Sequence, residues 1–524
     1  MVARALEWTA APLAGVPMEI ELKLLLEPAD ADALRRHPML AQYAAAPARE
    51  QQLSDTYYDT PAQDFRQGGA GLRVRRVGTE WIQTLKGGGD AGAGLHRRQE
   101  WESAVVGPEP DLAALRKLVG RKDACGDLLR APGTAARLAP VFRTEVTRTV
   151  WDLVLPGGDT VELALDQGKL EAGGATAAVS EIELELKSGD AVRLFDFALA
   201  LQQQVHLRVA SSSKAERGYA LGQALPHQPV KASPVKLSRK DSVEKAFRTI
   251  AANCVAQIHA NSAGVADAYD EESLHQMRVG LRRLRSARGV FGKVLQLPPA
   301  LSAELDWLAY ELGHARDWDV MAGSTLPSIE DGMPPCRMLS DVIHAARETG
   351  QGARAAATDA ARSQRYTRLM LSLGRWLYGK GWRQQVPARA RLDVPARRVA
   401  ATVLRRADNK LRKRGKALAG GTPEARHRTR IAAKKMRYAS EFFASLYSGK
   451  QVKSFVKALT GLQDELGLLN DAVVAETLLA KVEDAHPGLA GPLAMVRTAL
   501  RQRADDTTQA QKAWKRFAKA RLPR

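Results

Sequence analysis

The chain has 524 residues, of which 45% are hydrophobic and 26% charged, and its formal net charge is +20. This length exceeds what one hydrophobic core supports, so we expect two or three domains, and the composition excludes a disordered chain. Three distant cysteines (Cys125, Cys254 and Cys336) exclude a disulfide framework and a cysteine-based zinc site.

We do not expect a signal peptide at the start of this sequence. Residues 1–17 lack the basic start and continuous apolar core of a signal peptide. No apolar run approaches the roughly 18–20 residues that a membrane helix needs. We therefore predict a cytoplasmic protein with no membrane partner. Because Met18 directly precedes the first charged strand, we also predict that residues 1–17 are disordered or precede the true start.

The first predicted strand begins Glu19-Ile20-Glu21-Leu22-Lys23. Side chains alternate between the two faces of a strand, so its charged residues share one face and its apolar residues the other. A single strand of this kind usually turns its charges to solvent. The pattern recurs, however, at Glu181-Ile182-Glu183-Leu184-Glu185, near the other end of the same region.

Between these two segments, short alternating runs and glycine-rich turns predict further antiparallel strands. We predict them at residues 72–77, 81–85, 96–104, 142–155, 160–165 and 179–187, with helices near 30–43, 111–119 and 191–204. Residues 18–222 are therefore predicted to form an α+β domain with an antiparallel sheet.

Strand parity collects many charged side chains on one face of this sheet. They either face solvent, with an apolar layer covering the other face, or line a barrel. Carboxylates favour hard cations such as Mg²⁺ or Mn²⁺, and Arg and Lys favour phosphate. A lumen that held both would suit a metal–polyphosphate complex.

The ordered charged elements resemble the CYTH superfamily, the triphosphate tunnel metalloenzymes. The similarity begins with the ExExK pattern at Glu19, Glu21 and Lys23 and continues to Ser213-Lys214-Ala215-Glu216-Arg217. Between them lie Arg73 and Arg75, Lys86, Arg98-Gln99-Glu100-Trp101-Glu102, and Glu181, Glu183 and Glu185.

The resemblance implies an eight-stranded antiparallel tunnel that binds inorganic tripolyphosphate, nucleoside triphosphate or thiamine triphosphate. It implies phosphate contacts from Lys23, Arg73, Arg75, Lys86, Arg98, Arg143, Lys214 and Arg217. The implied metal ligands are Glu19, Glu21, Glu100, Glu102, Glu162, Asp166, Glu183 and Glu185. The residues expected to be catalytic are Glu19, Glu21, Lys23 and Lys86. Mg²⁺ or Mn²⁺ would be the cofactor for phosphoryl transfer to water.

A proline-containing polar stretch at residues 223–237 is predicted to be a linker, and residues 238–524 are predicted to be all α-helical. Residues 1–225 hold 26 Lys/Arg and 30 Asp/Glu, whereas the remainder holds 52 and 28. The cationic excess therefore lies entirely in the helical part, which indicates a polyanionic partner.

The helical part contains an internal repeat. Residues 275–285 match residues 427–437, and residues 312–320 match residues 466–474. Two features in the same order at nearly the same spacing indicate a duplicated helical unit. On each first helix, one His and three basic residues fall on one stripe, which destabilises an isolated helix.

This pattern resembles the CHAD domain, which implies two four-helix bundles around a basic groove for inorganic polyphosphate. The implied binding residues are His275, Arg278, Arg282, Arg283, Arg285, His427, Arg430, Lys434, Lys435 and Arg437. The Leu-Gly segments at 312–313 and 466–467, each followed by Asp, are interpreted as contacts between helices.

Together the two halves predict a metal-dependent tripolyphosphatase that yields pyrophosphate and phosphate and is associated with polyphosphate granules. Three alternatives remain: a granule-binding protein without catalysis, a tunnel acting on nucleoside or thiamine triphosphate, and nucleic-acid binding by the basic half. The last is disfavoured because the basic stripes contain no aromatic residue for base stacking beyond Tyr438.

Overall fold

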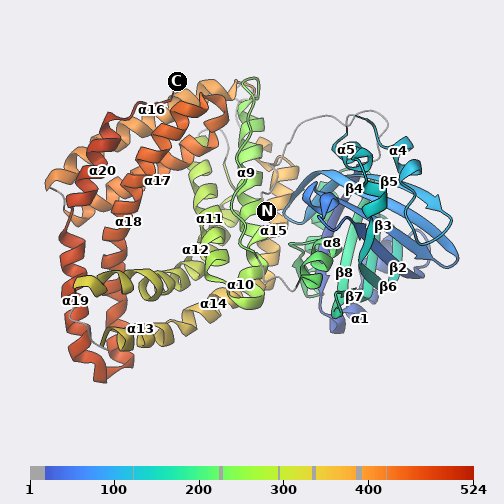
Figure 1. The fold of residues 1–524 in the computed structure, drawn as a ribbon, viewed down its shortest axis with the longest axis horizontal. Helices are drawn as coiled ribbons and strands as arrows, with labels where there is room; N and C mark the ends of the chain where they lie inside the picture. The colour runs from blue at the N-terminus through green and yellow to red at the C-terminus, as the bar shows by residue number, and fades with distance from the viewer. Residues whose placement is uncertain are drawn as a thin grey trace. The chain divides into compact units, whose positions relative to one another are not determined.

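The computed structural model describes residues 18–121, 123–223, 228–292, 296–332, 338–384, 392–420 and 422–523. The predictions for residues 1–17, and for part of the linker at 223–237, fall outside these described residues. The chain divides into two compact units (Figure 1). The first takes the chain up to Gln228 together with Arg362–Gly381, and the second takes Pro229–Ala361 and the chain from Trp382 onward.

Within the described part of the first unit, nine strands form one antiparallel sheet in the order β5-β4-β3-β2-β6-β7-β8-β1-β9. Because β1 pairs with β5 as well as with β8, eight strands close into a barrel, and β9 adds to β1. This confirms the predicted eight-stranded antiparallel fold. The strands are β1 (Met18–Leu26), β2 (Arg49–Asp59), β3 (Ala70–Val77), β4 (Glu80–Gly92), β5 (Leu95–Val105), β6 (Ala139–Val154), β7 (Thr160–Ala172), β8 (Ala175–Ser188) and β9 (Leu207–Val209).

Helices of this unit cover the barrel, most of them in the loops between strands. They are α1 (Ala31–Arg35), α2 (Pro38–Tyr43), α3 (Asp64–Gln67), α4 (Leu112–Leu118), α5 (Ala124–Arg130), α6 (Thr134–Arg137), α7 (Val192–Leu201), α8 (Lys214–Gly222) and α15 (Gln364–Tyr378). Outward-facing Leu72 and Leu85 pack with Leu115 of α4 and Leu129 of α5 in one apolar cluster. Because the apolar side chains of these strands are buried on the outer face, their polar side chains face the lumen.

Helix α8 closes one end of the lumen. A capping box between Ser213 and Glu216 fixes its start. Its Tyr219 packs edge-on against Phe142, with ring centroids 5.1 Å apart, and Phe142 stacks on Tyr57 at 4.3 Å. These rings make one part of this end apolar, whereas Lys214 and Arg217 of the same helix contact the charged part of the lumen.

Helix α15 comes from the helical half of the sequence but packs on the barrel unit. Its Gln364 side chain donates to the Leu207 carbonyl of β9 at 3.0 Å and accepts from the Leu207 amide at 3.4 Å. Tyr378 stacks on Phe195 of α7 at 5.5 Å. Because β9 pairs with β1, α15 supports the strand that begins the charged motif.

We expect Gly374→Ala to destabilise the barrel unit by about 1–3 kcal/mol. A Cβ at Gly374 would lie 2.2 Å from Cε1 of the buried Phe195 ring, so the helix or the ring must move. Gly352→Ala is the matched control, because that glycine lies in α14 (Gln351–Arg362) with no atom within 4 Å of its added Cβ. Thermal unfolding compares the two, and equal melting temperatures would contradict the packing assigned to α15.

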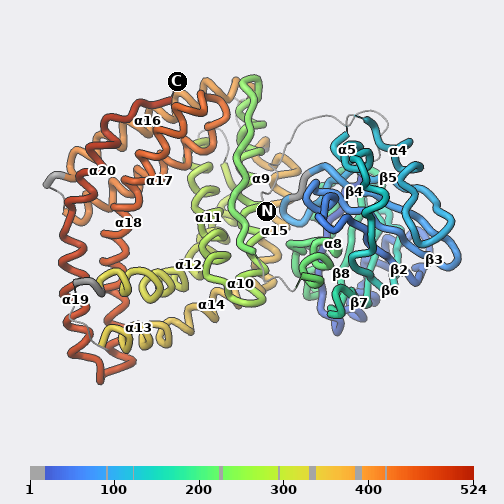
Figure 2. The backbone as a smooth tube through the Cα atoms, viewed as in Figure 1, coloured from blue at the N-terminus to red at the C-terminus, as the bar shows by residue number. Residues whose placement is uncertain are grey.

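The second unit is helical, as predicted, and Figure 2 traces its path. Its helices are α9 (Val243–Ala260), α10 (Ser262–Ala268), α11 (Glu271–Phe291), α12 (Pro299–Val320), α13 (Met338–Thr349), α14 (Gln351–Arg362), α16 (Ala396–Gly415), α17 (Pro423–Phe442), α18 (Gly449–Ala485), α19 (Ala490–Asp505) and α20 (Thr508–Lys519). One core joins Trp318 of α12 and Val342 of α13 to Leu479 of α18 and Val496 of α19. Across the part of the chain that the structure describes, no helix is both long and apolar enough to span a bilayer.

Candidate functional site

The polar residues of strand β1 lie inside the barrel. Glu21 and Lys23 are buried, and their register neighbours on β8 are Glu185 and Glu183. On its other side, β1 pairs with β5, and Glu19 shares the inward face of Glu21. Register neighbours in an antiparallel sheet lie about 5 Å apart at Cβ. The arrangement therefore places four carboxylates on adjoining strands, and the Lys23 ammonium contacts two of them, Glu21 and Glu183.

A buried acidic cluster, defined here as Asp166, Glu181 and Glu183, lies on β7 and β8. One carboxylate oxygen from each residue lies within 4.8 Å of the others. Lys214 of α8 donates from Nζ to Asp166 Oδ2 at 2.6 Å, to Glu183 Oε1 at 3.1 Å, and to Glu181. Arg148 of β6 donates to both oxygens of Asp166 at 2.7 Å and to Glu183 Oε2 at 2.6 Å. Internal cations therefore neutralise this cluster.

These cations determine the charge state of the acidic cluster. Burial alone would raise the pKa of Glu183, but Lys214, Lys23 and Arg148 hold it well below its ordinary value. Burial also opposes the lowered pKa of Asp166, and Lys214 and Arg148 prevail there as well. The ionised carboxylates in turn raise the pKa of Lys214 against its burial. Glu183, Asp166 and Lys214 therefore carry charge at neutral pH.

A second set of lumen carboxylates, the rim group, has fewer cations. It consists of Glu19, Glu100, Glu162 and Glu185. Lys86 donates to both oxygens of Glu19, at 2.6 and 2.7 Å, and lies 3.1 Å from Glu100. Burial nevertheless raises the pKa of Glu19 to about 7, because Lys86 offsets only part of it. Burial also raises the pKa of Glu185. Lys187, 2.8 Å from that carboxylate, offsets only part of this shift, and nearby Glu162 adds to it. The raised values indicate negative charge that an additional cation would stabilise.

A third group joins β2 to β3. Asp55 is 1% exposed and accepts from Arg75 Nε at 2.7 Å, from Arg75 Nη2 at 2.9 Å and from Arg73 Nη1 at 3.4 Å. Burial would raise the pKa of Asp55, but Arg75 and Arg73 hold it well below its usual range. Asp55 thus orients two guanidinium groups, and Nη2 of Arg73 also lies 4.0 Å from Glu100 and from Glu102.

The structure brings nearly all predicted tunnel residues onto the inward face of the barrel or to its α8 end. They are Glu19, Glu21, Lys23, Arg73, Arg75, Lys86, Arg98, Glu100, Glu102, Glu162, Asp166, Glu183, Glu185, Lys214 and Arg217. Glu102 lies nearest to solvent, with half of its side chain exposed. The roles assigned to these residues stay predictions.

Arg143 is the exception, and its expected place in the tunnel was wrong. It is exposed and pairs in register with Thr56 and Glu171, which lie on the outer face. Arg148, five residues further along β6, has the opposite parity and enters the lumen beside Asp166. An odd separation along a strand places two residues on opposite faces.

Three lumen residues had no predicted role: Asp55, Arg148 and Glu181. Glu181 has the parity of Glu183, so its sequence position did indicate the inward face. It accepts from Lys214 and Arg217 of α8. Asp55 and Arg148 had no such signal, because each lies in a long strand whose inward face only the pairing partners reveal.

The lumen carboxylates fit a hard divalent cation, which prefers oxygen ligands. The acidic cluster already holds the Lys214 ammonium, so a metal ion there would have to displace it. The rim group is under-compensated, and Glu21 lies beside it in register with Glu185. Within the described residues, only the oxygens of the acidic cluster lie close enough together to share an ion, so an ion held by Glu19, Glu21 and Glu185 would require these side chains to move together.

In the second unit, the two predicted basic stripes converge. The convergent basic cluster consists of Arg278 and Arg282 on α11 and Arg430 and Lys434 on α17. Burial, together with Arg430 and Arg282, lowers the pKa of Lys434 to about 7. Burial and Arg282 also lower the pKa of Arg278 to about 10. Arg282 of α11 lowers the pKa of Lys434 on α17, so the two basic stripes lie close enough together to form one site.

Counter-charges around this cluster are sparse. Asp317 of α12 lies 4.0 Å from Arg278, and Asp471 of α18 lies 3.6 Å from Arg430. This equivalence shows the predicted duplication in space and supports the interpretation of the two segments as helix contacts. Within the described residues, the buried Nε donors of Arg278, Arg282 and Arg430 have no hydrogen-bond partner. Such donors favour an incoming anion.

The remaining predicted residues of this unit have different environments. Burial and Arg316 lower the pKa of His275 to about 4, so its imidazole is neutral. Arg285 contacts Asp306 at 2.7 Å and lines a pocket of about 540 Å³. Arg437 contacts Glu441 at 3.0 Å. His427 and Lys435 are exposed.

Arg283 does not flank the basic cluster, so its predicted place was wrong. It is 4% exposed and donates to Gln257 Oε1 at 2.9 Å and to Asn253 Oδ1 at 2.7 Å. One residue further along a helix turns the side chain by about 100°, which points Arg283 toward α9 and into the core.

Comparisons with known proteins agree with both predicted domains. The CYTH domain family matches residues 17–219, and the CHAD domain family matches residues 249–480. An inorganic triphosphatase of Haemophilus influenzae is 37% identical over 205 residues, which cover 39% of this chain and 55% of that protein. The chain thus spans about half the length of this curated relative. The crystal structure of the CHAD domain from the plant Ricinus communis is 36% identical with a TM-score of 0.52, and it covers 57% of this chain and 99% of its own.

Proposed function

Because this chain carries a CYTH domain followed by a CHAD domain, we propose that its tunnel hydrolyses inorganic tripolyphosphate to pyrophosphate and phosphate with Mg²⁺ or Mn²⁺. The homology of the tunnel to an inorganic triphosphatase supports this substrate. The observation that carries the proposal is the mixed lumen, where paired carboxylates and cations lie on the inner face of one closed barrel. We also propose that the helical domain binds inorganic polyphosphate.

In the proposed mechanism, the internal ion pairs exchange partners when substrate enters. Lys23, Lys86, Arg73 and Arg75 turn from carboxylates to phosphate oxygens, and Arg98, Arg148, Lys214 and Arg217 hold the remaining phosphate charge. Glu19 and Glu21, freed from these pairs, would hold the metal ion together with Glu185. When bound, the ion neutralises phosphate charge and lowers the pKa of the attacking water. Catalysis is then mainly orientation and charge stabilisation, with no covalent intermediate.

The metal requirement should fall as the pH rises. Glu19 has a pKa of about 7, so below pH 7 a proton competes with the metal ion for this carboxylate. We expect the Mg²⁺ concentration for half-maximal activity to drop by about tenfold per pH unit up to pH 7 and to level off above it. Metal titrations at pH 6, 7 and 8 measure this. A Glu19→Gln variant should lose the pH dependence, and an unchanged metal requirement across this range would contradict the role of Glu19.

A substrate panel tests the proposed activity. Phosphate release is measured from tripolyphosphate, ATP, thiamine triphosphate and long-chain polyphosphate, with Mg²⁺ or Mn²⁺. Preference for ATP or thiamine triphosphate would favour another tunnel substrate, and no release from any of them would favour a binding protein. The full chain should be used, because α15 belongs to the barrel unit.

For the helical domain, the under-compensated basic cluster supports polyphosphate as the ligand. Binding to many cations releases counterions, so the affinity should fall steeply with added salt, as it does for DNA. Competition between polyphosphate and RNA at fixed salt tests the ligand class. The domain would then hold the enzyme on polyphosphate granules in the cytoplasm, where the buried free thiol of Cys254 suits a reducing environment.

A further inference from the structure

The outer face of the barrel carries a basic pocket that the proposed tunnel chemistry does not use. It lies on the hairpin of α4 and α5 (Figure 1) and has a volume of about 580 Å³. We call it the hairpin pocket. Its lining residues are Arg116, Lys117, Arg121, Arg130, Ala131, Pro132 and Gly133.

Main-chain carbonyls hold two arginines of the hairpin pocket in place. Arg116 donates from Nε and Nη2 to the Leu129 carbonyl at 2.9 and 2.8 Å. Arg130 donates from Nη2 to the carbonyls of Arg116 at 2.8 Å and Val119 at 2.9 Å. Leu115 and Leu129 pack in the apolar cluster on the outer face of the barrel, which holds the hairpin in place. Both guanidinium groups are therefore fixed before any ligand binds, which lowers the entropic cost of binding.

The charge of the hairpin pocket is not compensated. No carboxylate lines it, and none of its four cations forms an ion pair with any residue in the described ranges. The Nη1 atom of Arg130 is buried and has no hydrogen-bond partner among those residues. Four cations with no carboxylate beside them favour an anionic ligand in the pocket.

We propose that the hairpin pocket binds a condensed phosphate, either free pyrophosphate or part of a polyphosphate chain. Guanidinium groups match phosphate oxygens in pairs, and four cations in one pocket suit more than one phosphate group. No aromatic side chain lines the pocket, so it offers no stacking surface for a base. The site is separate from the lumen and does not depend on hydrolysis there.

Hydrogen–deuterium exchange of the full chain tests this proposal locally. We expect pyrophosphate or long-chain polyphosphate to slow exchange in peptides from α4 to α6. If pyrophosphate slows exchange, the free anion is a sufficient ligand. If long-chain polyphosphate slows exchange and pyrophosphate does not, the ligand is the polymer. Equal protection by sulfate or by a single-stranded oligonucleotide, or no protection by any condensed phosphate, would overturn the assignment.

Charge-reversal variants provide the control. Arg121→Glu and Lys117→Glu change exposed side chains and leave the carbonyl-bound arginines intact. Each should weaken the ligand-dependent protection by about tenfold or more, which corresponds to about 1.4 kcal/mol. Arg36→Glu makes the same charge change at an exposed position after α1 and should leave protection unchanged. Equal weakening by Arg36→Glu would show a general charge effect and overturn the site. Tripolyphosphate hydrolysis, measured in parallel, reports separately on the tunnel.

Discussion

Replacement of Glu183 by glutamine is expected to lower kcat/KM for tripolyphosphate by about a hundredfold or more, or about 2.7 kcal/mol. Glu183 contacts Lys23, Arg148 and Lys214, so one carboxylate orients cations from three different elements. Glutamine keeps the shape but removes the charge. The cations would then repel one another and would no longer be held in position for phosphate oxygens.

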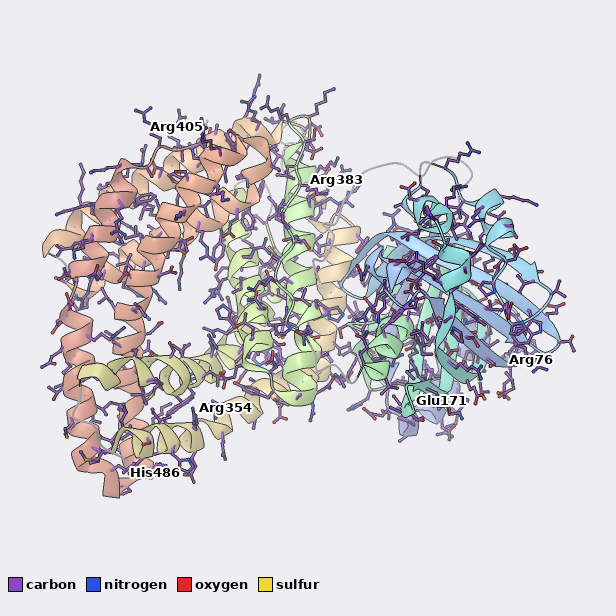
Figure 3. The ribbon with its side chains drawn as sticks, in the orientation of Figure 1. Arg76, Glu171, Arg354, Arg383, Arg405 and His486 are labelled. Carbon is purple, nitrogen blue, oxygen red and sulfur yellow. The ribbon has the colours of Figure 1, made fainter. Side chains whose placement is uncertain are left out.

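The control for this substitution is Glu171→Gln. Glu171 lies on β7, on the outer face of the barrel, where it contacts only exposed Lys169 at 2.7 Å in the described structure (Figure 3). It should leave hydrolysis unchanged. Circular dichroism and the melting temperature separate loss of catalysis from loss of folding. A Glu183→Gln protein that folds and retains wild-type turnover would contradict the proposed active site.

Replacement of Lys434 by glutamine is expected to weaken polyphosphate binding by about tenfold and to reduce the salt dependence by about one ion. The same change should raise the free energy of unfolding slightly. Burial and two arginines lower the pKa of Lys434 to about 7, so charging this residue is unfavourable in the free protein. A bound polyanion reverses that balance and should draw a proton onto the lysine.

Lys435→Gln is the matched control, because it removes the same charge from the next residue, whose side chain is exposed. Binding isotherms at several salt concentrations and denaturant melts compare the two variants. If Lys435→Gln weakened binding as much as Lys434→Gln, the ligand would respond to net charge and not to the convergent basic cluster. A loss of stability in Lys434→Gln would contradict the unfavourable environment assigned to the lysine.

The lumen and the convergent basic cluster both contain buried charged side chains, but they differ in how these charges are balanced. In the barrel, Arg148, Lys214 and Arg217 form ion pairs with the acidic cluster. The buried charges therefore balance one another when no ligand is bound. In the helical unit, Arg278 and Lys434 have lowered pKa values and few counter-charges. A lumen of exchanging ion pairs suits a mixed metal–phosphate ligand, whereas an excess of cations suits a polyanion alone.

The sequence by itself determined which strands carry charge toward the lumen wherever the alternation was clear. Glu19, Glu21 and Lys23 alternate with apolar residues, and so do Glu181, Glu183 and Glu185. Side-chain parity along a strand is a local property, and an apolar face must be buried. The repeated basic helices were visible for a similar reason, since the duplication preserves their spacing.

Only the tertiary structure decided the features that depend on strand pairing and helix packing. Arg143 and Arg148 lie on one strand, and only its partners showed that Arg148 enters the lumen. Arg283 and Arg282 are adjacent on α11, and packing against α9 buried the former. The amphipathic pattern of α15 predicts a buried face but not the surface that covers it, because the hydrophobic effect is non-directional. For these residues, the neighbouring strand or helix decides where the side chain lies, and the local sequence pattern does not.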